Sequence, residues 1–276
     1  NSTLTPAIYI FLKNSTINNI YMKVPSGHIY SIKIDYVLLD VNSSWYTAQN
    51  GLSMYDISRL LYGSGRFGIM AEASGIVLLK KNYTGQIVYY DPLFENFNFN
   101  QFNLGPKSIK ENGYLKATNI TNTMVWYGPY TGLPPGVYNI TFQIRTDNNS
   151  KNNLLTLDVS SDIGKNILIS KTINGSAFSY ENRWTNISLT INLTNFYGYV
   201  EFRGYAIKWN GSVEMKNVIV KQISPPFRSK EFYELYNMMN LIPSNSTIYV
   251  QNGLPDPIPE LSTGYNLQNN ISNSTE

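Results

Sequence analysis

The chain has 276 residues, a net charge of +3, no cysteine and one histidine. These numbers exclude disulfides, thiolate zinc sites, iron–sulfur clusters and metal sites built from several histidines. Charged residues make up only 14% of the chain and are scattered, which argues against a nucleic-acid partner.

The first segment, residues 1–95, predicts a small α/β unit. Ala7–Phe11 is an apolar strand, and Lys33–Val41 is a near-continuous apolar run typical of a strand buried on both faces. Ser53 is placed to cap a helix that ends at Gly63. Residues 66–85 follow as two strands around a turn at residues 74–75. A unit of this size buries little apolar surface, so we expect a further element to complete it.

The second segment, residues 96–225, predicts an antiparallel β-sandwich of jelly-roll type. From Tyr114 onward the sequence contains eight β segments at short spacing. The alternation is clean in residues 137–144, where Tyr138, Ile140, Phe142 and Ile144 fall on one face. The predicted fold class is therefore mainly β, with a small α/β unit beside the sandwich.

The third segment, residues 226–276, follows a Pro-Pro linker and predicts a helix at Arg228–Pro243 and a strand at Ser246–Asn252. These are the parts that the first unit lacks. They complete an α/β unit either in the same chain or in a neighbouring one, and a fragment of a tandem-repeat protein is a third alternative. Donation to a neighbour would give head-to-tail self-association, as in a filament or an envelope layer.

Asparagine is unusually frequent, with 35 residues beside 26 serines and 19 threonines. Random placement would give about six Asn-x-Ser/Thr sequons, the acceptor sites of N-glycosylation. The sequence has fourteen, at Asn1, Asn14, Asn42, Asn82, Asn119, Asn139, Asn148, Asn174, Asn186, Asn192, Asn210, Asn245, Asn270 and Asn273. This excess predicts an exported, extracellular protein that carries N-linked glycans. No membrane span or signal peptide is recognisable, so we expect any signal or anchor to lie outside this sequence.

The charged residues do not form an evident catalytic group. Asp35 and Asp40 are five apart on one strand and face opposite sides, and Glu72 is interpreted as a residue at a hairpin edge rather than a catalytic acid. Glu201 and Arg203 share a face, which favours a structural ion pair. The sequence therefore predicts no enzyme activity, no cofactor and no metal.

Aromatic residues are the candidates for binding. A sugar-stacking platform on the sandwich would use Trp126, Tyr127, Tyr130, Trp184 and Trp209. Packing in the core is the alternative, and the one we favour for each tryptophan.

Several long motifs resemble a known family: residues 34–46, 67–85, 126–146 and 199–204. They are similar to the extracytoplasmic part of archaeal multi-span membrane proteins of unknown function, whose hydropathy resembles that of lipid-linked glycosyltransferases. The resemblance covers most of Ile32–Ile223 and implies a jelly-roll-like domain, but no catalytic residues. This chain departs from the family because it has no membrane spans and because its "LIPSNST" motif (Leu241–Thr247) follows the sandwich.

These observations predict an exported, heavily glycosylated structural protein of the cell surface, with other surface glycoproteins as further partners. The alternatives are a carbohydrate-binding module and an accessory exodomain of a membrane glycosyltransferase.

Overall fold

The computed structural model describes residues 35–41, 54–63 and 65–226, and the backbone of five short strands nearer the termini. Those strands are β1 (Ile10–Phe11), β2 (Ile20–Lys23), β3 (Ile29–Ile32), β18 (Thr247–Val250) and β19 (Asn266–Asn269). β1, β2 and β3 form one antiparallel sheet.

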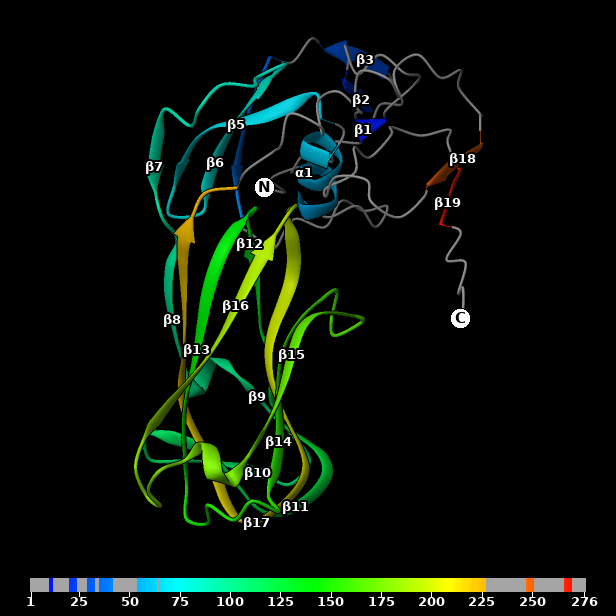
Figure 1. Cartoon of the computed structure of the whole chain (residues 1–276). Helices are drawn as coiled ribbons and strands as arrows, with labels where there is room; N and C mark the ends of the chain where they lie inside the picture. Colours follow the sequence, from blue (N-terminus) through cyan, green and yellow to red (C-terminus); the bar gives the residue numbers. More distant parts are fainter. Residues whose placement is uncertain are drawn as a thin grey trace, which may run out of the picture.

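Most of the described chain is an antiparallel β-sandwich, as the sequence predicted (Figure 1). Its strands are β8 (Phe94–Asn98), β9 (Asn103–Leu104), β10 (Ser108–Glu111), β11 (Tyr114–Tyr127), β12 (Pro129–Leu133), β13 (Gly136–Thr146), β14 (Leu154–Ser161), β15 (Asn166–Asn174), β16 (Thr185–Leu193) and β17 (Tyr197–Ser224). Two short 3-10 helices, Phe99–Gln101 and Gly175–Ala177, join strands.

The two layers share the long strand β17. Its first half pairs with β14, and its second half pairs with β13 and β8. Between these halves Gly211 has a φ of +84°, and the pairing with β11 shifts register between Thr118 and Ile120. Such an irregularity lets a strand bend from one layer into the other. Two of the eight β segments expected from the sequence, residues 197–207 and 212–223, are therefore one strand.

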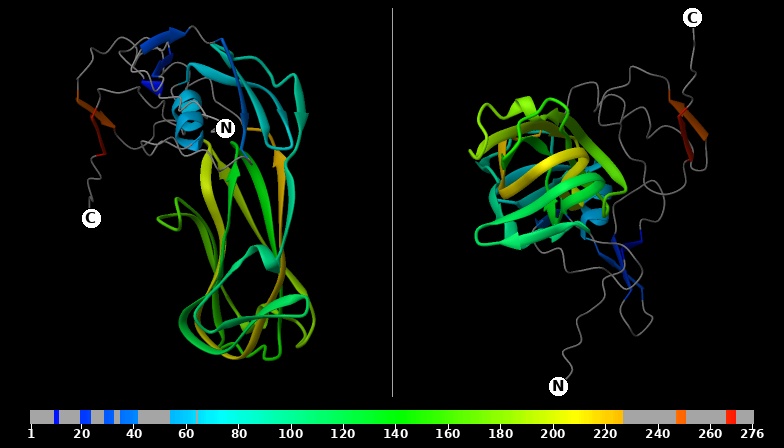
Figure 2. Two further views of the ribbon diagram at one scale, coloured as in Figure 1. Left: turned by 180° about the vertical axis from the view of Figure 1, so that it is seen from behind. Right: turned by 90° about the horizontal axis from the view of Figure 1, so that it is seen from below.

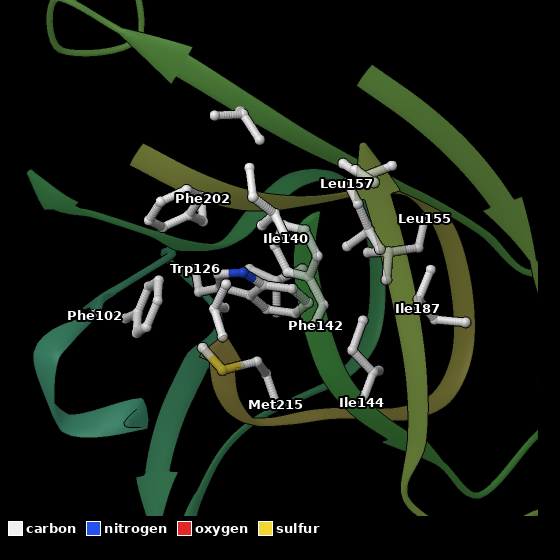
Figure 3. Close-up of a cluster of buried hydrophobic side chains, with 14 of the residues drawn as sticks. Phe102, Trp126, Ile140, Phe142, Ile144, Leu155, Leu157, Ile187, Phe202 and Met215 are labelled. Carbon is white, nitrogen blue, oxygen red and sulfur yellow. The ribbon is translucent and has the colours of Figure 1, made fainter. Parts of the chain in front are cut away.

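The core fills the space between the layers (Figure 3). Alternation in β13 is as predicted: Tyr138, Ile140, Phe142 and Ile144 are fully buried, and the residues between them are half-buried. In the end-on view of Figure 2, the strands of the sandwich enclose the space that this core fills. An apolar side chain at every second position thus fixes which face of each strand points inward.

The α/β unit lies at one end of the sandwich (Figure 1). It consists of β4 (Tyr36–Asp40), α1 (Met54–Gly63), β5 (Phe67–Ala73), β6 (Ile76–Lys81) and β7 (Tyr89–Asp91), in the sheet order β4-β6-β5-β7. The helix and the turn at Ser74–Gly75 occur where the sequence placed them, with φ values of +48° and +91° in the turn. Phe196 of the sandwich joins the core of this unit and packs edge-on against Tyr62 at 5.7 Å between ring centroids.

The prediction that the strand at Lys33–Val41 is buried on both faces was wrong. Leu39 and Val41 are buried, whereas Tyr36 and Leu38 are 54% and 69% exposed. β4 pairs with β6 along one edge, and only one of its faces covers the core. A continuous apolar run thus marks an outer strand of this sheet rather than a central one.

The C-terminal prediction can be followed only in part, because the helix expected at Arg228–Pro243 lies outside the described residues. The strand expected at Ser246–Asn252 corresponds to β18, which pairs in parallel with β19. Near the predicted domain boundary at residue 95, β7 ends at Asp91 and β8 begins at Phe94.

Candidate functional site

The outer face of the layer formed by β8, β13, β16 and the second half of β17 is polar. Thr141 and Ser188 are directly opposite in register, and their hydroxyl oxygens are 2.8 Å apart. Gln143 Nε2 donates to Asn186 Oδ1 at 3.5 Å. Amides and hydroxyls thus line this face, and such groups bond to water or to sugars without carrying charge.

One end of this face carries a cluster that we call the Trp184 surface: Tyr114, Lys116, Arg145, Trp184, Glu214 and Lys216. Its centre is Glu214, a buried carboxylate whose oxygen Oε2 accepts a hydrogen bond from Arg145 Nε at 2.6 Å. Arg145 Nη2 lies 2.5 Å from the same oxygen, and Lys116 Nζ lies 3.6 Å from Oε1. With Lys216, the cluster has three cations and one acid and therefore carries net positive charge.

The aromatic rings of the Trp184 surface lie against Arg145. The guanidinium carbon is 4.6 Å from the ring centroid of Trp184 and 5.1 Å from that of Tyr114, a geometry typical of cation–π contacts. The two rings meet edge to face at 6.0 Å. Trp184 and Tyr114 remain half-buried, so part of each ring reaches solvent.

The candidate five-residue sugar platform does not form, and core packing, the interpretation favoured from the sequence, is correct for two of its three tryptophans. Trp126 and Trp209 are fully buried between the layers, because both lie on inward-facing positions of their strands. Gly204 allows this: a Cβ there would be only 2.3 Å from Trp126 Cζ2. Of the three predicted tryptophans, only Trp184 reaches the surface.

Tyr127 and Tyr130 are half-buried and lie on another part of the sandwich. Burial of the ring raises the pKa of the Tyr130 phenol, and the nearby charge of Glu201 raises it further. Neither tyrosine contributes to the Trp184 surface, which draws its second ring from Tyr114. Sequence reasoning missed Tyr114, Arg145 and Glu214. The alternation along β13 and the aromatic residue two positions before Asn186 were the available signals.

Glu201 and Arg203 share a face as the sequence predicted, but Asp158 is the main partner of the arginine. Arg203 donates to both oxygens of Asp158, at 2.7 and 3.1 Å, and its Nη1 lies 4.0 Å from Glu201 Oε2. Burial raises the pKa of Glu201, and Arg203 partly opposes that shift. The arrangement is a structural ion network on one sheet face.

Glu72 is buried at 1% exposure, so the expectation of a hairpin-edge residue was wrong. Its side chain lies near Tyr90 of β7 and near Tyr138 and Gln222 of the sandwich, which remove it from solvent. No hydrogen bond of ordinary geometry reaches either carboxylate oxygen. Burial raises the pKa of Glu72 to about 7, and the nearby side chain of Gln222 partly opposes that shift. Burial raises the pKa of the Tyr138 and Tyr90 phenols, and the nearby charge of Glu72 raises each further.

A pocket of about 420 Å³ opens beside Tyr90 in the α/β unit. Its wall includes Tyr62, Tyr83 and the linker residues Pro225 and Pro226. Asp35 and Asp40 are exposed, and His28 lies outside the described residues. Acidic and histidine side chains of the described segments form no group of three that could hold a metal ion.

Eight of the fourteen sequon asparagines have described side chains, and none of the eight is buried. Asn139 and Asn148 are half-buried, and the six others are exposed: Asn82, Asn119, Asn174, Asn186, Asn192 and Asn210. The remaining six sequons, at Asn1, Asn14, Asn42, Asn245, Asn270 and Asn273, lie outside the described residues.

The side-chain nitrogen is unengaged at the described sequon asparagines. Among the eight described sequons, Nδ2 donates no hydrogen bond; where the side chain is engaged, as at Asn119, Asn174 and Asn186, the oxygen accepts. Several other asparagines do donate through Nδ2: Asn149, Asn153, Asn166, Asn195 and Asn217. Nδ2 is the atom that N-glycosylation substitutes, so the fold leaves it available at each described sequon.

Comparison with known proteins yields fold neighbours but no family. No family model and no curated protein matches the chain. Among solved structures, the C-terminal family 6 carbohydrate-binding module of a laminarinase from Zobellia galactanivorans aligns over 47% of this chain and 99% of its own, with 15% identity and a TM-score of 0.32. A xylan-binding module of family 15 aligns over 49% and 99% (9% identity, TM-score 0.39). A family 35 module from Clostridium thermocellum aligns over 46% and 96% (18% identity, TM-score 0.35). Likeness at this level leaves the ligand of this chain open.

Within the described segments, no helix is long and apolar enough to cross a lipid bilayer.

Proposed function

We propose that the chain is the exported, N-glycosylated part of a non-enzymatic cell-surface protein. The proposal is supported by the accessibility of the sequon asparagines. Each of the eight described ones presents an unengaged Nδ2 at a surface that is exposed or half-buried. Attachment joins Nδ2 to the anomeric carbon of a phosphate-activated sugar. The bond from that carbon to the phosphate oxygen breaks, and the amide loses one proton.

The sheet edges give the glycans a structural role. β16 is the end strand of its layer, and it carries Asn186 and Asn192 on its outward face. An exposed edge strand is a template for pairing with other chains. Bulky polar glycans on this strand would prevent such pairing.

The test is the intact mass of the protein isolated from its own source. We expect a mass well above the 31.3 kDa of the polypeptide, falling toward that value after chemical deglycosylation. Each attached sugar adds a defined increment, so the number of steps reports how many sequons are used. A native protein at the bare polypeptide mass would contradict the proposal.

Carbohydrate recognition is the second candidate function, and the Trp184 surface favours it. A partly exposed indole beside Tyr114, with Lys216 Nζ 6.0 Å from its ring centroid, combines a stacking surface with a hydrogen-bond donor. Such a surface suits a pyranose ring from another molecule or from the chain itself.

Self-association is also part of the proposal, and β4 is the strand that supports it. Its Tyr36 and Leu38 are exposed beside Ile76, which is 45% exposed on the neighbouring strand β6. Among the described strands, β4 pairs only with β6 and has one open edge. An open, apolar edge of this kind can accept a strand from a second copy.

We expect Leu38→Lys to weaken self-association, because a charged residue on an edge strand opposes strand addition. Light scattering over a concentration series measures the effect. Ile109→Lys is the matched control, since Ile109 is 54% exposed on β10 of the sandwich. A parent protein that stays monomeric throughout the series, or an assembly equally sensitive to both changes, would rule out this edge.

A further inference from the structure

We propose that a glycan on Asn186 folds back onto Trp184, with the pyranose ring nearest the protein stacked on the solvent face of the indole. The inference rests on the proposed N-glycosylation and names the carbohydrate that the Trp184 surface takes: the chain's own.

The first support is placement. Trp184 immediately precedes β16, and Asn186 is the second residue of that strand. Residues two apart in an extended chain point to the same face and are separated by about 7 Å. Asn186 is exposed, and Gln143 engages only its oxygen. A single pyranose attached to Nδ2 is therefore within reach of the indole.

The second support is the environment of the indole. Ile144 pairs with Thr185, so Arg145 lies beside Trp184 on the neighbouring strand β13. Arg145 is bound to Glu214, a buried residue of β17, and its guanidinium covers one face of the indole. The ring extends across these strands to meet Tyr114 of β11. The guanidinium thus holds the ring in place, and the half-buried indole keeps part of its surface in solvent for a ligand.

The third support is the chemistry of the exposed face. The π-system of an indole is negative on its face, and the axial C–H groups of a pyranose are weakly positive, so the two stack favourably. Lys216 is exposed, and its Nζ lies 6.0 Å from the ring centroid. It can donate to hydroxyl or carboxylate oxygens at the rim of a stacked sugar.

The fourth support is that the arrangement is specific to one site. Of all fourteen sequons, only Asn186 has an aromatic residue two positions earlier. Asn192 is exposed on the same face of the same strand, with Thr190 in the equivalent position. Asn192 is therefore a matched control on the same strand.

The experiment is a double-variant cycle on the full chain, secreted from a host that glycosylates sequons. Glycopeptide mapping first establishes the occupancy of Asn186 and Asn192. The unfolding equilibrium is then measured for the parent, Trp184→Ala, Asn186→Gln and the double variant. We expect Asn186→Gln to lower the folding equilibrium constant about threefold to tenfold in the parent, the range measured for aromatic stacking. It should have no such effect in the Trp184→Ala background.

Asn192→Gln is the control, and its effect should be the same with and without Trp184→Ala. If Trp184 had only a structural role, Trp184→Ala would change the effects of Asn186→Gln and of Asn192→Gln equally. Nuclear Overhauser contacts between the indole protons of Trp184 and sugar C–H protons give a second readout, which we expect to vanish in Asn186→Gln.

Each other outcome decides against the inference. An occupied Asn186 with no coupling and no contacts overturns it and leaves the glycoprotein proposal standing, as does an empty Asn186 on a chain glycosylated elsewhere. Contacts that form only when free oligosaccharide is added to Asn186→Gln would show binding in trans instead. A chain without any glycan overturns both proposals.

Discussion

Replacing Glu72 by glutamine should remove most of the change in stability between pH 4.5 and 7. The folded carboxyl has a pKa of about 7, against 4.5 for an unperturbed glutamate. Within this window the unfolded state has released the proton and the folded state keeps it. The free energy of unfolding therefore falls as pH rises through the window, by about 3 kcal/mol for this shift, and the contribution is flat outside it.

Urea unfolding at pH 4.5 and pH 7.5 measures the effect for the parent and for Glu72→Gln. Burial also raises the pKa values of Glu95 and Glu201, so both proteins should lose stability with rising pH, and the difference between them isolates Glu72. Glu181→Gln, at an exposed site, should behave like the parent. Identical pH profiles for the parent and Glu72→Gln would show that this carboxyl is not buried.

Replacing Trp126 by alanine should destabilise the protein by about 3 to 5 kcal/mol, the usual cost of removing a large aromatic side chain from a core. Trp126 is fully buried, and its Nε1 has no hydrogen-bond partner, so the loss is one of packing. Trp184→Ala should cost about 1 kcal/mol or less, because that side chain contributes surface contacts with Arg145.

The same urea titrations distinguish the two tryptophans. Equal losses would place Trp184 in the core and remove the basis for carbohydrate recognition. A small loss of stability in Trp126→Ala would instead indicate that Trp126 lies at the surface, contrary to the packing described above.

The sandwich was predictable because its signal is local. In β13 and β16 every second residue is apolar, and that alternation fixes both the strand and its inward face. The α1 helix and the Ser74–Gly75 turn were predictable for a similar reason: each is defined by a few adjacent residues.

The errors concern properties that neighbours in space decide. The run from Tyr36 to Val41 is equally apolar whether one or two faces are covered, so the sequence did not reveal an outer strand. Glu72 has a charged side chain of the kind that is usually exposed, yet β7 and the sandwich enclose it. The Trp184 surface joins β11, β13, β16 and β17, and no sequence window contains all four.

The sequence defines the positions of the sequons, but it does not show whether their Nδ2 atoms are accessible. Asn139 lies in a sequon, with Thr141 two residues later, and Asn153 does not. In the fold, Asn153 Nδ2 bonds to the carbonyl oxygens of Asn148 and Asn210, whereas the Nδ2 of Asn139 donates to no neighbour. The claim that sequon asparagines keep Nδ2 available therefore depends on the structure.

Site-resolved glycopeptide mapping of the protein from its own source tests that claim most directly. The account predicts glycans on the described sequons, above all on the six exposed ones: Asn82, Asn119, Asn174, Asn186, Asn192 and Asn210. Peptides that carry all of these asparagines unmodified, in a protein with the bare mass of 31.3 kDa, would contradict it.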